Sequence, residues 1–301
     1  MRKTDVGGQA VIEGVMMRGS HGIAIAVRKE NGEIEIKNDN TIPFLKKYPK
    51  LNVPFIRGIF VLIDSLKIGL NSLNYSASFF EDDVEESKFD KWFKNKFGDK
   101  ANDIVMAVTI LISVIISITV FVGIPTGVAN IFKTFIQSTV ALNLIEALLR
   151  IAILISYMYI ISKMKEIYRV FQYHGAEHKT IFCYEAEEEL TVENVKKFSR
   201  FHPRCGTNFL FLIMFVSIFV FAFSGWGSFA ERLIFRIVLI PVVSGITYEI
   251  LKWLGKSNNK LAEIIAFPGL KLQRLTTREP DDSQIEVAIA SIKASEGIKD
   301  E

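Results

Sequence analysis

Four long apolar blocks, separated by polar segments, set the pattern of this sequence. They cover residues 104–124, 142–162, 208–224 and 233–254. The first block contains no charged residue and, at about 1.5 Å rise per residue, is long enough as a helix to cross a hydrocarbon core of roughly 30 Å. Because backbone inside a bilayer must satisfy its own hydrogen bonds, each block is expected to be helical. The pattern predicts a mainly α membrane protein with four transmembrane helices.

Charged residues interrupt two of these blocks. Glu146 and Arg150 have the i, i+4 spacing that lets them pair on one helix face, so neither is expected to face lipid. We interpret this pair as a brace between helices. Glu249 lies near the end of the last block, where an intramembrane ionisable residue is a candidate for function.

The residues before the first block predict a small β region. Apolar runs at 23–27 and 34–36, joined through Asn31 and Gly32, are typical of a β-hairpin. Residues 6–19 mix glycines with apolar residues and predict a loop or a strand held close to another part of the chain.

Three further segments have distinct patterns. Residues 55–73 are apolar but interrupted by charges, which favours an amphipathic or interfacial helix over a span. The acidic run 81–86 then predicts the start of a solvated linker. Beyond the last block, residues 267–270 predict a turn, and a helix is expected to begin at Pro280.

Basic residues predict how the helices are oriented. They cluster before the first block, after the second and after the fourth, which places both termini and segment 163–206 in the cytoplasm of a multi-pass protein of the inner (plasma) membrane. The predicted regions are 1–53 (cytoplasmic, with the hairpin), 54–102 (interfacial helix and charged linker), 103–254 (four-helix transmembrane domain, including cytoplasmic segment 163–206) and 255–301 (cytoplasmic tail with a helix).

Composition agrees with a membrane location and argues against nucleic acid. Half of the 301 residues are hydrophobic and the mean hydropathy is positive, which together argue against an ordinary soluble protein. The formal net charge is only +3, and the basic residues flank apolar blocks instead of forming a stripe, so no nucleic-acid partner is expected. The expected partner is the lipid bilayer, and a protein partner or a second copy of the chain stays open.

The polar segment between the second and third blocks carries the candidate chemistry. His174, Glu177 and His178 match the H-x-x-E-H pattern, in which two histidines bind zinc and the glutamate activates water. On a helix, the two histidines would lie one turn apart on one face. The pattern is short, and Gly175 weakens a helix, so a polar helix with hydrogen-bonded histidines is the alternative.

Further ligands are available in the same segment. A zinc site needs three or four nitrogen, sulfur or oxygen donors. His202 or Cys205 could complete a set begun by His174 and His178, and the predicted topology brings Glu249 to the same membrane face as a further contributor. The alternatives are that His202 braces the turn at Pro203, that Cys205 is a small buried side chain, and that Glu249 pairs with Lys252.

Several runs of the sequence together carry a resemblance to a known family. They are residues 7–19 (GGQAVIEGVMMRG), 174–179 (HGAEHK), 202–207 (HPRCGT), 279–280 (EP) and 285–288 (IEVA). Through them the chain is similar over nearly its whole length to the YqhQ-like family of bacterial membrane proteins, a largely uncharacterised family labelled as a predicted metal-dependent enzyme. The resemblance implies a membrane location and a metal, and it points to His174, Glu177, His178, His202 and Cys205.

Three functional hypotheses follow. The first is a zinc-dependent hydrolase with its site at the cytoplasmic face and Glu177 as general base. The second is a non-enzymatic membrane scaffold or assembly factor, in which the metal only holds the loop between the second and third helices. The third is a small-solute transporter. It is suggested by helix-interrupting and charged residues inside predicted spans, namely Pro241, Gly245, Glu146 and Arg150.

Overall fold

The computed structural model describes residues 4–39, 44–80, 98, 101–223, 228–257 and 259–298. The predicted acidic linker at 81–86 lies outside these residues. The chain divides into two compact units. We name them the α/β unit (Met1–Phe79, Tyr157–Ser217 and Pro241–Glu301) and the helical unit (Phe80–Ser156 and Ile218–Ile240).

A four-stranded antiparallel sheet forms the start of the α/β unit. Its strands are paired in chain order and comprise β1 (Gly7–Val11), β2 (Gly14–Arg18), β3 (Ile23–Arg28) and β4 (Ile34–Asp39). The hairpin of β3 and β4 confirms the prediction, with Gly32 in the left-handed conformation that its turn requires (φ 87°). Residues 7–18 form a second hairpin, whose turn places Glu13 at φ 47°.

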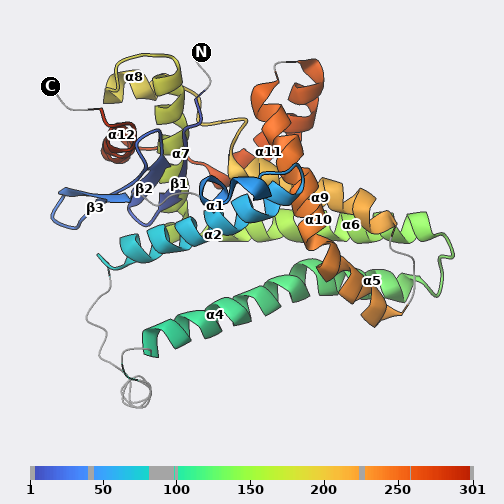
Figure 1. The fold of residues 1–301 in the computed structure, drawn as a ribbon. Helices are drawn as coiled ribbons and strands as arrows, with labels where there is room; N and C mark the ends of the chain where they lie inside the picture. The colour runs from blue at the N-terminus through green and yellow to red at the C-terminus, as the bar shows by residue number, and fades with distance from the viewer. Residues whose placement is uncertain are drawn as a thin grey trace. The chain divides into compact units, whose positions relative to one another are not determined.

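Two helices pack on this sheet and close its core (Figure 1). They are α7 (Lys165–Glu185), which contacts β1 and β2, and α12 (Asp282–Glu296), which contacts β2, β3 and β4. A capping box between Asp281 and Gln284 starts α12, and Gly297 ends it, in agreement with the helix predicted to begin at Pro280. The core between the layers is fully buried and includes Val15, Met17, Ala26, Tyr173, Ile285 and Ile292.

The α/β unit also contains further helices. The interfacial segment predicted at 55–73 is helical and forms α2 (Ile56–Ala77), and short elements precede α2 and follow α7. Those elements are α1 (Phe44–Lys47), a 3₁₀ turn (Pro49–Leu51) and α8 (Val192–Lys196).

The turn predicted at residues 267–270 is wrong. Pro268 and Gly269 lie inside α11 (Lys260–Thr276), whose buried residues Ala262, Ala266, Gly269, Gln273 and Thr276 recur at helical spacing. Gly269 is needed there because the Oδ1 atom of Asn208 would lie 2.0 Å from an added Cβ. The free energy gained by burying this helix face therefore outweighs the loss of the backbone hydrogen bond that Pro268 cannot donate.

Three helices among the described residues are long and apolar enough to cross a membrane, as expected for a membrane protein. They are Ile104–Phe132, α6 (Thr139–Ile161) and α10 (Phe229–Lys256). The block predicted as the third span, residues 208–224, forms α9 (Gly206–Ala222), which is apolar but has only 17 residues. Many large apolar side chains of these helices are exposed, including Leu111, Ile116, Phe235 and Val238, as lipid contact requires.

The first of these helices continues beyond the predicted end at residue 124. It runs through α4 (Ala101–Ile118), a π-helical segment (Thr119–Gly123) and α5 (Ile124–Phe132). Pro125 has no N–H to donate to the carbonyl of Phe121, and Nε of Arg150 donates to that carbonyl at 3.0 Å. The π-helical segment and this replacement donor let the helix pass the proline.

Candidate metal centre

Helix α7 places two histidines one turn apart on one face. The ring centroids of His174 and His178 are 4.4 Å apart. Gly175 lies within α7, and the segment after α11 packs directly against it. A Cβ on Gly175 would lie 2.0 Å from the carbonyl oxygen of Arg278, so only glycine permits this approach.

Cys205, immediately before α9, completes a group of three potential ligands. Its Sγ lies 3.1 Å from Nε2 of His174. His174, His178 and Cys205 each offer one ligand atom, and these atoms lie within 4.8 Å of one another. A zinc ion held by imidazole nitrogens at about 2.0 Å and a thiolate at about 2.3 Å would keep such atoms about 3.5 Å apart. The donor types and spacing of the group therefore fit a metal ion after small side-chain adjustments.

Backbone carbonyls fix the orientation of both imidazoles. Nδ1 of His174 donates to the carbonyl of Thr276 at 2.8 Å, and Nδ1 of His178 donates to the carbonyl of Arg200 at 2.5 Å. Because a carbonyl only accepts, Nδ1 carries the proton in both rings, and the lone pair is on Nε2. This is the arrangement by which partners of a metal-bound histidine orient it.

The sulfur of Cys205 also has hydrogen-bond donors. The backbone N–H of Thr207 lies 3.5 Å from Sγ, and the hydroxyl of the same residue lies 3.3 Å from it. Donors of this kind accompany metal-bound cysteine sulfur and tune it. Each of the three potential ligands is thus oriented by a neighbouring group.

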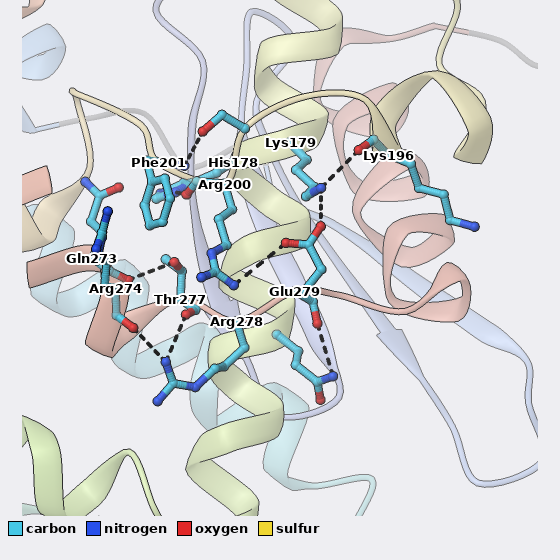
Figure 2. A network of polar contacts seen from close by, with 12 residues as sticks. His178, Lys179, Lys196, Arg200, Phe201, Gln273, Arg274, Thr277, Arg278 and Glu279 are labelled. Atoms are coloured by element: carbon cyan, nitrogen blue, oxygen red, sulfur yellow. Dashed lines mark hydrogen bonds and ion pairs between the residues drawn. The ribbon is translucent and has the colours of Figure 1, made fainter. Parts of the chain in front are cut away.

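A polar network holds the segments that supply these carbonyls (Figure 2). Lys179 is buried, donates to the carbonyl of Lys196 at 3.0 Å and forms an ion pair with Glu279, which Arg200 also approaches at 3.7 Å. The backbone N–H of Arg278 donates to the carbonyl of Phe171 at 2.8 Å. The loop before α9 and the segment after α11 are therefore both anchored to α7 beside the histidines.

His202 lies next to the group of three but is not one of its members. Its ring centroid is 5.6 Å from that of His178 and 4.5 Å from that of Phe182. Its Nδ1 accepts from the N–H of Arg204 at 3.3 Å, so the proton is on Nε2. Burial, together with the nearby His178, Arg204 and His174, lowers the pKa of His202 to about 2, which keeps the ring neutral.

Glu249 is not brought to the group either. Its carboxylate accepts from Nε of Arg57 at 2.7 Å, is contacted by a second guanidinium nitrogen of the same residue, and accepts from the N–H of Phe55 at 3.2 Å. These contacts come from α2 and the residue before it. The predicted contribution of Glu249 to a metal site is therefore replaced in the structure by a bidentate ion pair.

Glu177, the predicted general base, is buried on α7 and points toward β1. The N–H of Gly8 donates to its carboxylate, and the Cγ atom of Glu177 would lie 2.9 Å from a Cβ on Gly8. Burial raises the pKa of Glu177 to about 7, although His174 and the Gly8 hydrogen bond act in the opposite direction. Sequence reasoning did not connect the glycine-rich run at 6–19 with this carboxylate.

Similarity to known proteins identifies the family of this chain. The chain matches the family described as "Protein of unknown function (DUF1385)" over residues 53–297. The chain belongs to this family. It is 38% identical over 290 residues to a protein of Bacillus subtilis (strain 168) named "Uncharacterized protein YqhQ", which covers 95% of this chain and 90% of that protein. No solved structure matches the chain.

In this DUF1385 protein Gly8 is one of the residues that line a cavity. The cavity has a volume of about 810 Å³, and its lining includes Asp5, Gly8, Arg18, Lys46, Tyr184 and Glu296. Gly8 thus borders the cavity and also donates a hydrogen bond to Glu177.

Proposed function

We propose that this protein is an integral membrane protein that binds zinc through His174, His178 and Cys205 at the cytoplasmic face and acts as a zinc-dependent hydrolase. The observation that carries the proposal is the convergence of three ligand atoms within 4.8 Å, with both imidazoles held by backbone carbonyls. Such second partners are typical of metal sites.

The donor set supports zinc over harder cations. Imidazole nitrogen and thiolate sulfur suit zinc, whereas magnesium and calcium prefer oxygen ligands. Three protein ligands leave a position open, which is characteristic of catalytic zinc sites, while structural sites have four protein ligands. When bound in such a site, zinc lowers the pKa of water to about 7 and polarises a carbonyl or phosphoryl oxygen.

The residues of the chain have distinct roles in this proposal. His174 and His178 present Nε2 to the metal because their Nδ1 protons are committed to Thr276 and Arg200. Glu177, adjacent to His178 in the chain and buried beside Gly8, is the residue that accepts a proton as general base. The cavity beyond Gly8 is the region in which we expect a substrate to bind.

The organisation of the chain supports a site at one membrane face. The C-terminal end of α6, the N-terminal part of α9 and the C-terminal half of α10 all belong to the α/β unit. A chain that leaves this unit in α9 and returns to it in α10 is consistent with α9 as a short fourth span. Lys163 and Lys165 follow α6 and Lys256 is the last residue of α10, which favours a cytoplasmic location for the unit.

A structural zinc site is the second candidate, and the position of His202 favours it. The ring of His202 packs within 5.6 Å of that of His178, so a change of tautomer and a small movement would supply a fourth ligand. The metal would then hold the loop before α9 in place, as in a membrane scaffold or assembly factor.

Metal analysis of the purified full-length protein tests both candidates. We expect about one zinc per chain in the wild type, little in His178→Ala, and wild-type content in Glu177→Gln, because Glu177 is not a ligand. A wild type without zinc would exclude both readings. If zinc is present, hydrolysis of chromogenic carboxyl and phosphate esters by the wild type but not by Glu177→Gln supports the hydrolase, and equal behaviour of the two proteins supports the structural site.

A further inference from the structure

The open end of the β1–β2 hairpin borders the cavity of about 810 Å³ in the α/β unit. In this hairpin Gly7 pairs with Arg18, and Gln9 pairs with Met16. Because directly paired residues of an antiparallel sheet share one face, these four positions lie on the same face, and all of them line the cavity. Residues of α2 line it as well. The glycine-containing run at 6–19 thus forms one wall of a space that α2 also borders.

Gly7 leaves open space on this wall. Its φ is not in the left-handed region, and a Cβ at this position would meet no atom of the described residues within 4 Å. Its neighbour Gly8 differs, because a Cβ there would lie 2.7 Å from the carbonyl oxygen of Met16. A glycine inside a strand weakens that strand, and it often marks a place where a ligand approaches the backbone closely. Neither backbone conformation nor packing requires glycine at position 7, so the space beside it is available to a bound molecule.

Arg18, opposite Gly7 on β2, supplies a positive charge to this space. The residue is half-buried, and within the part of the chain that the structure describes its guanidinium forms no hydrogen bond or ion pair. Arg57 of the same unit, by contrast, is paired with Glu249. The planar fork of a guanidinium matches the oxygens of a phosphate or a carboxylate. Arg18 is therefore available to bind such a group in the cavity.

Glu296 lines the same cavity, but its carboxylate is already occupied. It accepts from the backbone N–H of Ser20 at 2.7 Å, from the hydroxyl of Ser20 at 3.0 Å and from the hydroxyl of Tyr184 at 2.8 Å. These three donors satisfy the carboxylate without a guanidinium. Glu296 is thus a fixed part of the wall and is not the partner of Arg18.

The remaining charged groups of the lining favour a phosphate. They are Arg18, Lys46 of α1 and Asp5, and none of the three forms an ion pair among the described residues. Two positive charges against one negative charge match a phosphate monoester, which carries about 1.5–2 negative charges at pH 7, better than a carboxylate, which carries one. A cavity of about 810 Å³ also has the size of pockets that hold small organic molecules. Asp5 is then available to accept from a hydroxyl of the organic part.

We propose that this cavity binds a phosphate monoester. Arg18 and Lys46 hold the phosphate in the space beside Gly7, and Gln9 and Ser65 add neutral hydrogen-bond donors. The monoester is either a soluble compound or a lipid that ends in a phosphate, since both present the same oxygens. Such a compound is the substrate of the hydrolase proposed above, and its role as a substrate rests on that proposal. Its binding requires neither zinc nor hydrolysis.

Binding measurements on the full-length protein separate the two sources. Radiolabelled glycerol 3-phosphate is titrated onto the protein purified in detergent. In a second arm, the protein is reconstituted in nanodiscs of phosphatidylcholine with phosphatidic acid, and retained phosphatidic acid is measured by native mass spectrometry. We expect one of these probes to bind the wild type, and Arg18→Gln to weaken that binding about tenfold or more. Lys46→Gln should also weaken it, whereas Lys47→Gln, which changes an exposed lysine outside the lining, should have no effect.

Gly7→Ala tests the open space without removing a charge. The added Cβ meets no described atom within 4 Å, and alanine is less costly than glycine inside a strand. We therefore expect this variant to unfold at the temperature of the wild type or above it, while binding of the probe weakens. This comparison keeps the proposal testable if Arg18→Gln does not fold.

A variant without zinc separates this site from the metal centre. His178→Ala should lose zinc and still bind the probe, so a failure of the zinc proposal would leave phosphate binding intact. The proposal is overturned if neither probe binds the wild type, or if Arg18→Gln and Gly7→Ala bind as the wild type does. It is also overturned if His178→Ala loses the binding while Arg18→Gln retains it, since the phosphate would then lie on the metal.

Discussion

The Cβ atom that Gly175 lacks would lie 2.0 Å from the carbonyl oxygen of Arg278. Beside this contact, the N–H of Arg278 donates to the carbonyl of Phe171. The carbonyl of Thr276, two residues earlier, accepts from Nδ1 of His174. The glycine of the H-x-x-E-H run therefore permits the close approach of the segment that orients a potential metal ligand.

This contact predicts that Gly175→Ala is harmful even though alanine favours helices. Displacement of the Arg278 segment should reduce the free energy of unfolding by about 1–3 kcal/mol, more than the helix propensity gained, which is about 1 kcal/mol. Thermal unfolding in detergent and zinc content measure the effect. Gly127→Ala is the matched control, because the nearest atom to its Cβ is 3.9 Å away, and this variant should be as stable as the wild type or more so.

Cobalt substitution should reveal whether Cys205 binds the metal. Cobalt bound by a thiolate gives a sulfur-to-metal charge-transfer band, which we expect in the wild type and not in Cys205→Ser. Cys183→Ser is the control, since Cys183 is buried at a separate place, where it contacts the carbonyl of Glu189 at 3.6 Å. Loss of the band in Cys183→Ser but not in Cys205→Ser would contradict the proposed ligand set.

Local patterns were sufficient for the elements whose signals lie within a few residues. The β3–β4 hairpin could be predicted because Gly32 supplies the positive φ of its turn. The β1–β2 hairpin was left open because Glu13, which no turn rule favours there, has the positive φ, and contacts from Ser76 and Arg169 support it. Distant residues hold that turn, so its sequence could not reveal it.

The candidate site was predicted only in part for a similar reason. Spacing on one helix brought His174 and His178 together, and proximity in the chain suggested Cys205. The partner of Glu249 is Arg57, 192 residues earlier in the chain, and the groups that orient the histidines are backbone carbonyls. Every residue has a carbonyl, so the sequence contains no signal for such partners.

Gln273 is expected to be important for the loop that carries His202. Its side chain accepts from the backbone N–H of His202 at 2.8 Å and donates to the carbonyl of the same residue at 2.7 Å. Gln273→Met preserves the shape but leaves two buried backbone groups without partners, which should lower the free energy of unfolding by about 2–4 kcal/mol. Gln172→Met loses an exposed hydrogen bond to the carbonyl of Glu279 and a long one, 3.4 Å, from the side chain of Gln284, and it should cost less than Gln273→Met; denaturant titrations can compare the two.

The ion pair of Glu249 with Arg57 predicts that this carboxylate has no role in metal binding. Glu249→Gln should retain the zinc content of the wild type, while the stability of the packing between α2 and α10 decreases. Arg57→Gln should have the same effect because it breaks the same pair. A loss of zinc in Glu249→Gln but not in Arg57→Gln would instead restore Glu249 as a ligand.

The thiol of Cys183 should react slowly and with a steep dependence on pH. Burial, with a smaller contribution from Glu188, raises its pKa to about 11, so at pH 8 only about one thiol in a thousand is ionised. In Cys205→Ser, where Cys183 is the remaining cysteine, alkylation by iodoacetamide should therefore accelerate about tenfold per pH unit between pH 8 and pH 10, provided the fold is retained. Mass spectrometry follows the modification, and the same variant unfolded in guanidinium chloride is the control. A native rate equal to the unfolded rate would show that the thiol is neither buried nor shifted in pKa.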